Sequence, residues 1–476
     1  MEDLLPKQPF FARHEFVGKL SKGDEVVDKV HVVVQYSLIK QGEIVGKVLG
    51  TTKICEKLRH IANLSDPYLE LTSEESEHIT PKISSEKTLL RRVTQRPAYS
   101  KDMSYVVANL NFDDITIMGH YGPGDTLERH LTFFLAGPRR LWSIHEAREF
   151  SFTGEIKNKV HNSKIELNED FPFEIEVIPW YFRDKTPAPD SHELTANVLA
   201  MHFDTKESLE RLSNENFVNS SRALADDITL LVSFLSRRWV TWYQYQLVTK
   251  DTVKTYVRRT RECTTQEVDW NDTFIAPHES REFLKIGLTK LRKLRADGFN
   301  LFMPIVYFVS GNEAKYLEEQ FTTLFLSLER IKDMFALKEG FRKNLLNKAF
   351  KKLGSLVSGV IKKNVESPDM FDRIQAKIPE LNRPSLRFVL ESLFKRYNID
   401  WRDIYPPGSD FTLIKTRDEL FHSSRELNID VLVKELYRLQ VLIQQLLLRM
   451  LDWVDLSHSP TDLIKKRLTT VENGSD

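Results

Sequence analysis

The chain has 476 residues, of which 41% are hydrophobic and 29% are charged, with 68 basic and 68 acidic side chains. This composition is typical of a globular protein and excludes wholesale disorder, and the length suits about three domains. The formal net charge of zero gives no global attraction to nucleic acid, so any such contact must come from a local cluster of charge.

The two cysteines, Cys55 and Cys263, are too few for a disulfide scaffold or a cysteine-based zinc cluster. Neither His145-Glu146 nor His278-Glu279 has the second histidine of a zinc-protease helix. No signal peptide is expected, and the longest apolar-rich stretch, residues 439–448, is shorter than the roughly 20 residues that cross a bilayer. The sequence therefore predicts a cytoplasmic protein with no membrane partner, no metal ion and no cofactor.

Residues up to about 183 show the alternation of β-strands. Val30, Val32, Val34, Tyr36 and Leu38 share one face at period two. The segments 131–137 and 171–180 repeat this pattern, and breaks rich in glycine and proline separate them, as a sandwich or curved sheet requires. The polar segment 71–87 is expected to be a surface loop.

A helix is expected over residues 206–238, followed by strands at 239–248 and 252–260. Helical periodicity dominates from about residue 280, and one apolar stripe at spacings of three and four consists of Leu317, Phe321, Leu324, Leu328, Ile331 and Phe335. A further helix is expected within 383–397, and the last within 428–454. The apolar arc of this last helix is wider than one bundle contact needs, which suggests a homodimer through the helical region.

The predicted fold class is therefore α+β. A β-rich, sandwich-like region covers residues 1–275 and divides at 183/184 if it holds two subdomains. A C-terminal α-helical bundle covers residues 276–476.

Arg417, Asp418 and His422 lie in the stretch FTLIKTRDELFHSSREL within this helical region. A guanidinium is a fixed positive charge, and an imidazole exchanges protons near neutral pH. Together they suffice for cleavage of a phosphodiester without metal, because one stabilises the phosphate while the other moves protons.

Helix geometry constrains how these groups meet. Asp418 and His422 are four residues apart, so they share a face and the carboxylate can orient the imidazole. Arg417 and His422 point about 140° away from each other on an ideal helix. Either Arg417 lies at a frayed helix start and reaches around, or a second copy of the chain completes the site across a two-fold axis.

A helix that carries R-[polar]-x3-H just before a long final helix resembles the HEPN ribonucleases. Arg417, Asp418 and His422 stand at that family's motif positions, and Glu329 in the segment SLERI resembles the acidic signature of its first core helix. Many members carry asparagine where this chain has Asp418. The pairing with a β-rich N-terminal half resembles the anti-phage ApeA-type proteins.

The resemblance implies a HEPN-like nuclease domain that cleaves cellular RNA, such as tRNA, during abortive infection, with the β-rich region as the sensor of a phage-derived trigger. His422 would act as base or acid on the ribose 2′-hydroxyl and the leaving oxygen, and Arg417 would stabilise the phosphate. DNA would then resist cleavage, and RNA products would end in 2′,3′-cyclic phosphate.

Two other classes of function stay open. In a silent HEPN-like scaffold, Arg417 and Asp418 form a surface ion pair and His422 fills a gap in the bundle, while the protein binds RNA or another protein. In a ligand-binding module, the β-rich region does the main work. We interpret its aromatic residues as core rather than as the lining of a cleft; they are Trp142, Trp180, Tyr181, Trp239, Trp242 and Tyr243.

A basic cluster lies upstream of the motif. Between residues 330 and 363 there are ten basic and two acidic residues. Such a cluster suits an RNA backbone, although a solvated helix face has the same composition. The candidate RNA-binding residues within it are Arg342, Lys343, Lys351 and Lys352.

Overall fold

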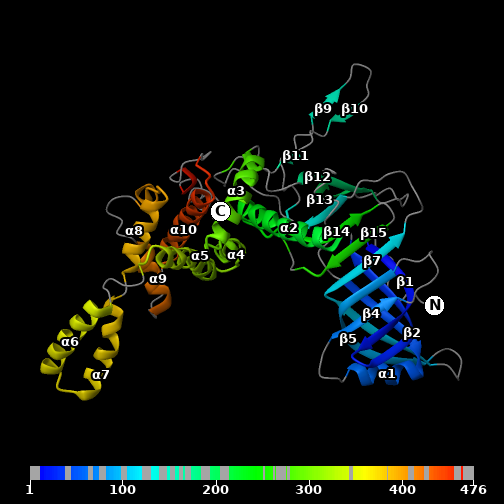
Figure 1. Cartoon of the computed structure of the whole chain (residues 1–476), viewed down its shortest axis with the longest axis horizontal. Helices are drawn as coiled ribbons and strands as arrows, with labels where there is room; N and C mark the ends of the chain where they lie inside the picture. The colour runs from blue at the N-terminus through cyan, green and yellow to red at the C-terminus, as the bar shows by residue number, and fades with distance from the viewer. Residues whose placement is uncertain are drawn as a thin grey trace. The chain divides into compact units, whose positions relative to one another are not determined.

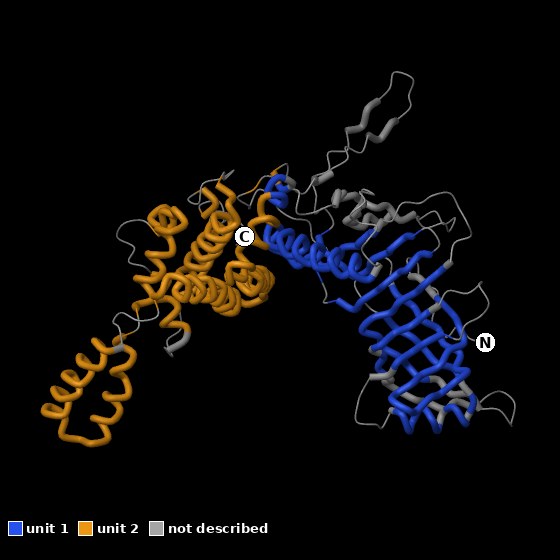
Figure 2. Tube along the Cα trace, viewed as in Figure 1, with its two compact units in different colours: residues 1–269, 280–285 blue, residues 270–279, 286–476 orange. Residues whose placement is uncertain are grey.

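The computed structural model describes residues 11–37, 44–62, 68–73, 82–97, 104–120, 130–138, 147–150, 156–159, 164–166, 173–183, 193–203, 214–249, 252–260, 263, 275, 279–341, 347–382, 384–405, 412–422, 428–454 and 462–464. The chain divides into two compact units (Figure 2). The first, here the β unit, comprises residues 1–269 and 280–285; the second, the helical unit, comprises residues 270–279 and 286–476. An α+β class is therefore correct.

Among the described residues, the β unit contains a 13-stranded sheet and a separate two-stranded ribbon, and every strand pairing is antiparallel (Figure 1). The strands are β1 (Phe11–Lys22), β2 (Glu25–Ser37), β3 (Ile44–Thr51), β4 (Tyr68–Ser73), β5 (Lys82–Pro97), β6 (Ser104–Phe112), β7 (Asp114–His120), β8 (His130–Ala136), β9 (Ala147–Phe150), β10 (Ile156–Lys159), β11 (Lys164–Glu166), β12 (Phe173–Arg183), β13 (Glu193–Phe203), β14 (Thr241–Val248) and β15 (Thr252–Arg258). The order in the large sheet is β11-β12-β13-β8-β14-β15-β7-β5-β4-β1-β2-β3-β6.

The long strand β5 closes part of the sheet on itself. It pairs with β4, with β7 and with β6, so the strands from β5 through β4, β1, β2 and β3 to β6 close on themselves. The expected sandwich or curved sheet is thus a single sheet that closes over part of its width.

The core of this closed part follows the predicted alternation. Val30, Val32, Val34 and Tyr36 are buried together, as expected; Leu38 lies outside the described residues. Helix α1 (Thr52–Ala62) adds Leu58 and Ile61 to the same core.

The prediction of a loop over residues 71–87 is wrong at both ends. Leu71 is buried in β4 and Ile83 is buried in β5. Each is a single apolar residue between serines, threonines and charged residues, so the local sequence is polar although one side chain points to the core.

Helix α2 (Asn214–Ser236) covers the part of the sheet around β14 and lies within the predicted helix; residues 204–213 are outside the described part of the chain. Ser233 fixes the connection to β14, because its hydroxyl accepts the Val240 N–H at 2.9 Å and donates to the Thr229 carbonyl at 2.7 Å. The strands β14 and β15 lie where the sequence predicts them.

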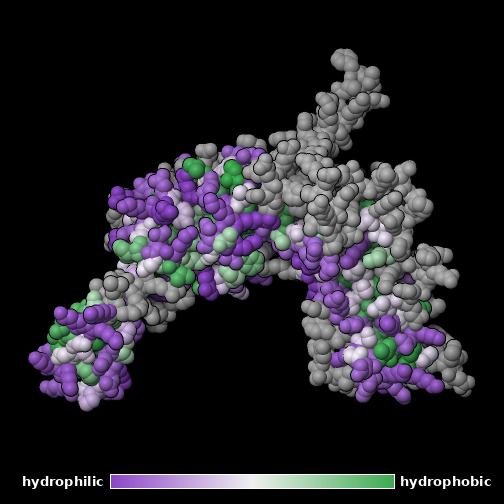
Figure 3. All heavy atoms as spheres, in the orientation of Figure 1, coloured by the Kyte–Doolittle hydropathy of each residue, from purple (hydrophilic) through white to green (hydrophobic). Residues whose placement is uncertain are grey.

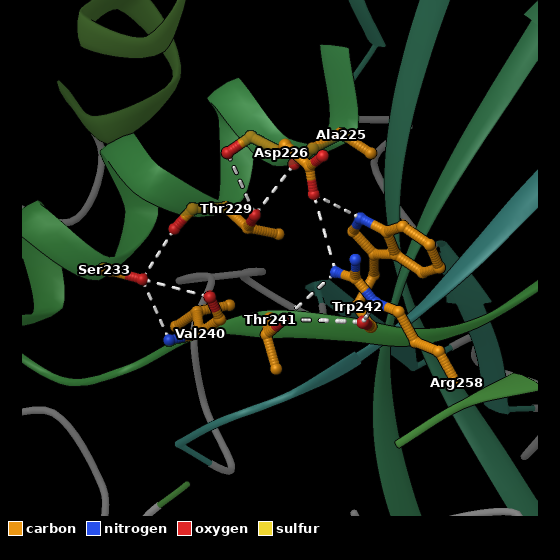
Figure 4. A network of polar contacts seen from close by, with 8 residues as sticks. All are labelled: Ala225, Asp226, Thr229, Ser233, Val240, Thr241, Trp242 and Arg258. Atoms are coloured by element: carbon orange, nitrogen blue, oxygen red, sulfur yellow. Dashed lines mark hydrogen bonds and ion pairs between the residues drawn. The ribbon is translucent and has the colours of Figure 1, made fainter. Parts of the chain in front are cut away.

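A polar network joins α2 to this sheet (Figure 4). The indole N–H of Trp242 donates to Asp226 Oδ1 at 2.7 Å, and Arg258 Nη2 lies 3.5 Å from the same oxygen. Arg258 Nε donates to the Trp242 carbonyl at 2.9 Å, and its guanidinium carbon lies 3.3 Å from the centre of the Trp242 ring. Arg258 is thereby held on three sides by its own unit.

An irregularity in β14 places the aromatic residues of this network on one face. Trp242 and Tyr245 are three residues apart, which in a regular strand would point them to opposite faces. The register shifts between Trp242 and Gln244, so the ring centres of Trp242 and Tyr245 lie 6.1 Å apart. Tyr245 in turn stacks on Tyr256, with 5.0 Å between their ring centres. Trp242 and Tyr243 are fully buried, which confirms them as core.

The other aromatic residues weighed with them divide into two groups. Trp239 is half-buried. Trp142, and the side chains of Trp180 and Tyr181, lie outside the described part.

Among the described residues, the helical unit contains most of α3 and seven further α-helices. Their bounds are α3 (Ser280–Ala296), α4 (Phe302–Glu313), α5 (Leu317–Lys338), α6 (Asn347–Asn364), α7 (Pro368–Lys377), α8 (Leu386–Arg396), α9 (Thr412–His422) and α10 (Ile429–Met450), with short 3-10 turns η3 (Ile378–Asn382) and η4 (Trp401–Asp403). No helix among the described residues is both long enough and apolar enough to cross a membrane.

Helix α5 contacts α4, α8, α9 and α10, and its predicted apolar stripe is buried from Phe321 to Phe335. Gly311 allows the close approach of α4, because a side chain there would meet Leu324 Cγ at 2.7 Å. Ser327 Oγ donates to the Pro304 carbonyl at 2.7 Å, which fixes the register of the two helices.

Helix α10 is buried on all sides from Arg438 to Leu448. Its broad apolar arc therefore packs within the same chain, against α4, α5 and α9 among others. The expected homodimer stays a prediction, but the observation that suggested it is explained by intramolecular packing.

Candidate functional site around Arg417

The site is built on α9, which two neighbouring helices hold in place. Leu413 and Thr416 are buried on the side that faces the bundle. At the first residue of the helix, the Thr412 hydroxyl donates to Glu435 Oε1 of α10 at 2.8 Å. These contacts leave the next residue, Arg417, at the edge of the bundle with its side chain 30% exposed.

Arg417 meets two residues of α5. Its Nη2 lies 3.7 Å from Glu329 Oε1, and its guanidinium carbon lies 5.8 Å from the centre of the Phe325 ring. Phe325 and Glu329 are four residues apart on one helix, so both face the same neighbour. The fold thus brings together Arg417 and Glu329, which are 88 positions apart in the sequence; their contact was not predicted.

Asp418 points to Arg417, whose Nη1 donates to Asp418 Oδ1 at 2.8 Å. In these contacts, the Arg417 guanidinium thus faces two carboxylates, those of Glu329 and Asp418, which are 29% and 53% exposed. A phosphate that binds here must displace or outcompete these carboxylates, because all three anions seek the same donors.

His422 is the last residue of α9, and its side chain lies outside the described part of the chain. Arg417 is the sixth residue of the helix, so the idea that it lies at a frayed helix start is wrong. Buried Leu413 and the bond from Thr412 hold the helix start in place. The other arrangement considered, completion by a second copy, stays a prediction.

The candidate RNA-binding residues divide into two groups. Lys351 and Lys352 are exposed on α6, which packs against α7 and η3. Arg342 and Lys343 lie outside the described residues.

A buried charged cluster next to the site was not predicted. Glu435 Oε1 accepts from Arg438 Nη1 at 2.7 Å as well as from Thr412, and their side chains are only 3% and 9% exposed. The Arg438 guanidinium lies 5.2 Å from the Tyr405 ring. Burial, with the nearby Glu435 carboxylate, raises the pKa of Tyr405 well above its usual value. The signal was present in the sequence, as two charged residues three apart inside the apolar stripe of the last helix.

Among the side chains that the structure describes, no group of three His, Cys, Asp or Glu residues is placed to hold a metal ion. Comparison with protein-family models, with curated proteins and with solved structures finds no match for this chain. The site must therefore be interpreted from its own residues.

Proposed function

We propose that the helical unit is a metal-independent endoribonuclease, with Arg417 and His422 as its catalytic residues. The observation that carries this proposal is the meeting of Arg417 with Glu329 at 3.7 Å on a partly exposed edge of the bundle. The same two positions carry the HEPN-like sequence signature. Cellular RNA such as tRNA is the proposed substrate, and defence against phage is the proposed setting, with a trigger acting on the β unit.

In the proposed reaction, the His422 imidazole takes the proton of a ribose 2′-hydroxyl, and the 2′-oxygen attacks the adjacent phosphorus. The bond from phosphorus to the 5′-oxygen breaks, and the departing oxygen takes a proton from water. Arg417 binds the phosphate oxygens while negative charge builds on them. The products are a 2′,3′-cyclic phosphate and a 5′-hydroxyl, and no metal ion takes part.

In this scheme Glu329 and Asp418 are positioning residues. They hold the guanidinium at the edge of α9 until RNA arrives, and the phosphate then replaces one of them. A second copy of the chain supplies the other half of the Arg417–His422 pair, because one regular helix points the two side chains apart.

A silent scaffold is the second candidate, and one observation favours it. Arg417 is already paired with two carboxylates, which is how a surface arginine with a purely structural role also looks. The two candidates differ in one property that can be measured, which is turnover of RNA.

The test is incubation of the purified full-length protein with bulk tRNA in the presence of EDTA. The proposal expects cleavage by the natural protein and a loss of at least 100-fold in Arg417→Ala, since removing one donor that stabilises the charge of a transition state costs roughly 10²–10³-fold. Arg387→Ala is the matched control, because Arg387 is an exposed helical arginine paired with Glu391 at 2.9 Å. Intact tRNA at high protein concentration, with or without a phage lysate as trigger, would favour the scaffold.

A further inference from the structure

Helix α6 separates its charged residues from its aliphatic residues. It carries no acidic residue and five lysines, namely Lys348, Lys351, Lys352, Lys362 and Lys363. At 100° per residue, these lysines fall within an arc of about 120°. The aliphatic and aromatic residues of the helix occupy the next ~140° of its circumference.

The aliphatic arc has a packed part and an exposed part. Val357 and Ile361 are half-buried, and the backbone at Gly354 approaches Ile378 of η3. Between this packed side and the lysines, Leu356 is 63% exposed and Val360 is 61% exposed. A strip of water-exposed aliphatic side chains therefore borders a strip of lysines on one helix.

Helix α6 packs against α7 and η3, and this hairpin of helices exposes further apolar residues. Met370 of α7 is 57% exposed and Leu381 of η3 is 60% exposed. The space-filling view shows hydrophobic residues and hydrophilic residues side by side on the visible face of α6 and α7 (Figure 3). No residue of α7 is buried, so α7 leaves most of its side chains accessible to solvent.

We propose that α6 is a docking surface for an anionic phospholipid membrane. The lysines meet the lipid phosphates, and Leu356 and Val360 enter the boundary between headgroups and acyl chains. Five lysines prevent the helix from crossing the bilayer, so it lies on the surface. This inference revises the expectation from sequence that the protein has no membrane partner, and it does not depend on the proposed nuclease activity.

The composition of α6 favours lipid over RNA. Proteins that bind single-stranded RNA stack its bases on aromatic rings or arginine planes. Helix α6 contains neither arginine, tyrosine nor tryptophan, and its one aromatic residue, Phe350, is half-buried. Lysines alone suit either phosphate, but exposed leucine and valine beside them gain nothing from an RNA backbone, whereas an apolar boundary removes them from water.

The experiment is sedimentation of the full-length protein with phosphatidylcholine vesicles that contain or lack phosphatidylglycerol. We expect binding to the anionic vesicles only, and weaker binding at high salt, because screening shortens the reach of surface charge. The double variant Lys352→Ala/Lys363→Ala should lower the affinity on the order of 30-fold, since each lysine near the surface contributes about fivefold.

The aliphatic strip is tested separately. Leu356→Ser/Val360→Ser should lower vesicle binding roughly tenfold while leaving the lysines in place. The matched control is Ile429→Ser/Val431→Ser on α10, where the two side chains are 67% and 44% exposed. Arg417→Ala should bind vesicles like the natural protein, which separates this result from the test of the nuclease.

Two outcomes would overturn the proposal. In one, the natural protein does not sediment with anionic vesicles; in the other, it sediments equally after both the lysines and the aliphatic residues are changed. If vesicle binding is absent and the lysine variant loses binding to tRNA, α6 is an RNA surface instead.

Discussion

Arg258 in the β unit and Arg417 in the helical unit each lie beside a carboxylate and an aromatic ring, but their surroundings differ. Arg258 stacks on Trp242 at 3.3 Å and donates to the Trp242 carbonyl at 2.9 Å. Burial lowers its pKa, although Asp226 partly offsets this effect. Such a guanidinium is held in one orientation.

Arg417 has looser neighbours. The centre of the Phe325 ring lies 5.8 Å from its guanidinium carbon, Glu329 Oε1 lies 3.7 Å from Nη2, and Asp418 Oδ1 accepts from Nη1 at 2.8 Å. The ring contact and the contact with Glu329 are longer than the contacts that Arg258 makes with Trp242. The comparison predicts that loss of Arg258 lowers stability more than loss of Arg417 does, and this difference can be measured.

The largest effect is expected for catalysis at the Arg417 site. His422→Ala should reduce RNA cleavage roughly 10²–10⁴-fold, because the imidazole is the proposed proton acceptor. His60→Ala is the matched control, since His60 also lies near the C-terminal end of a helix and is 64% exposed. Full activity in His422→Ala would show that the Arg417 and His422 site does not catalyse the cleavage.

In the network around Arg258, the largest loss of stability is expected when the Trp242 ring is removed. Trp242→Ala removes a fully buried side chain and the donor to Asp226, so the free energy of unfolding should fall by about 3–5 kcal/mol. Chemical denaturation of the full chain, followed by circular dichroism, measures this change. Phe302→Ala, at a side chain that is 47% exposed, should cost far less. Similar losses in both variants would mean that Trp242 does not organise this region.

The two arginines can be compared directly. Arg258→Ala should lower stability by about 2 kcal/mol, because it removes a charged donor to the Trp242 carbonyl and a cation–π contact with a fully buried ring. Arg417→Ala should change stability by less than about 1 kcal/mol, because its bond of 2.8 Å is to the half-exposed carboxylate of the adjacent residue, Asp418. The denaturant midpoints of the two variants measure both losses of stability. A larger loss in Arg417→Ala than in Arg258→Ala would contradict the comparison.

The smallest effect concerns alkaline pH. Burial, with the nearby Asp114 carboxylate, raises the pKa of Tyr256 from 10.0 to about 12. The phenol thus stays protonated in the folded chain at pH values where it ionises in the unfolded chain. Its contribution to stability is present below pH 10 and is lost as the pH rises toward 12.

Tyr256→Phe should therefore lose stability less steeply over this alkaline range than the natural protein does. Denaturation at a series of pH values measures the slope, and Tyr316→Phe, at a side chain that is 70% exposed, is the control. An unchanged slope in Tyr256→Phe would show that this phenol ionises at the same pH in both states.

Strong periodicity made much of the fold predictable. The valines of β2 and the stripe of α5 lie where their spacing predicts, because many apolar residues repeat the signal. The strands β4 and β5 were missed where Leu71 and Ile83 stand among few apolar residues in a polar segment. Pairing with distant strands, rather than local sequence, decides their structure.

The candidate site was predictable only in part. The contact of Arg417 with Glu329 depends on the packing of α9 against α5, which spacing does not reveal. The resemblance singled out both residues but did not predict that they meet. The aromatic cluster around Trp242 depends on the register shift after that residue, since strict alternation would place the Trp242 and Tyr245 rings on opposite faces. A local irregularity of this kind has no reliable signal in a single sequence.

The most direct measurement compares two substrates of one base sequence, one RNA and the other 2′-O-methylated throughout, incubated with the full-length protein in EDTA. If Arg417 and His422 cut through the ribose 2′-hydroxyl, only the unmodified RNA is cleaved, and its fragments end in 2′,3′-cyclic phosphate. Cleavage of both substrates, or of neither under any trigger, would contradict that chemistry.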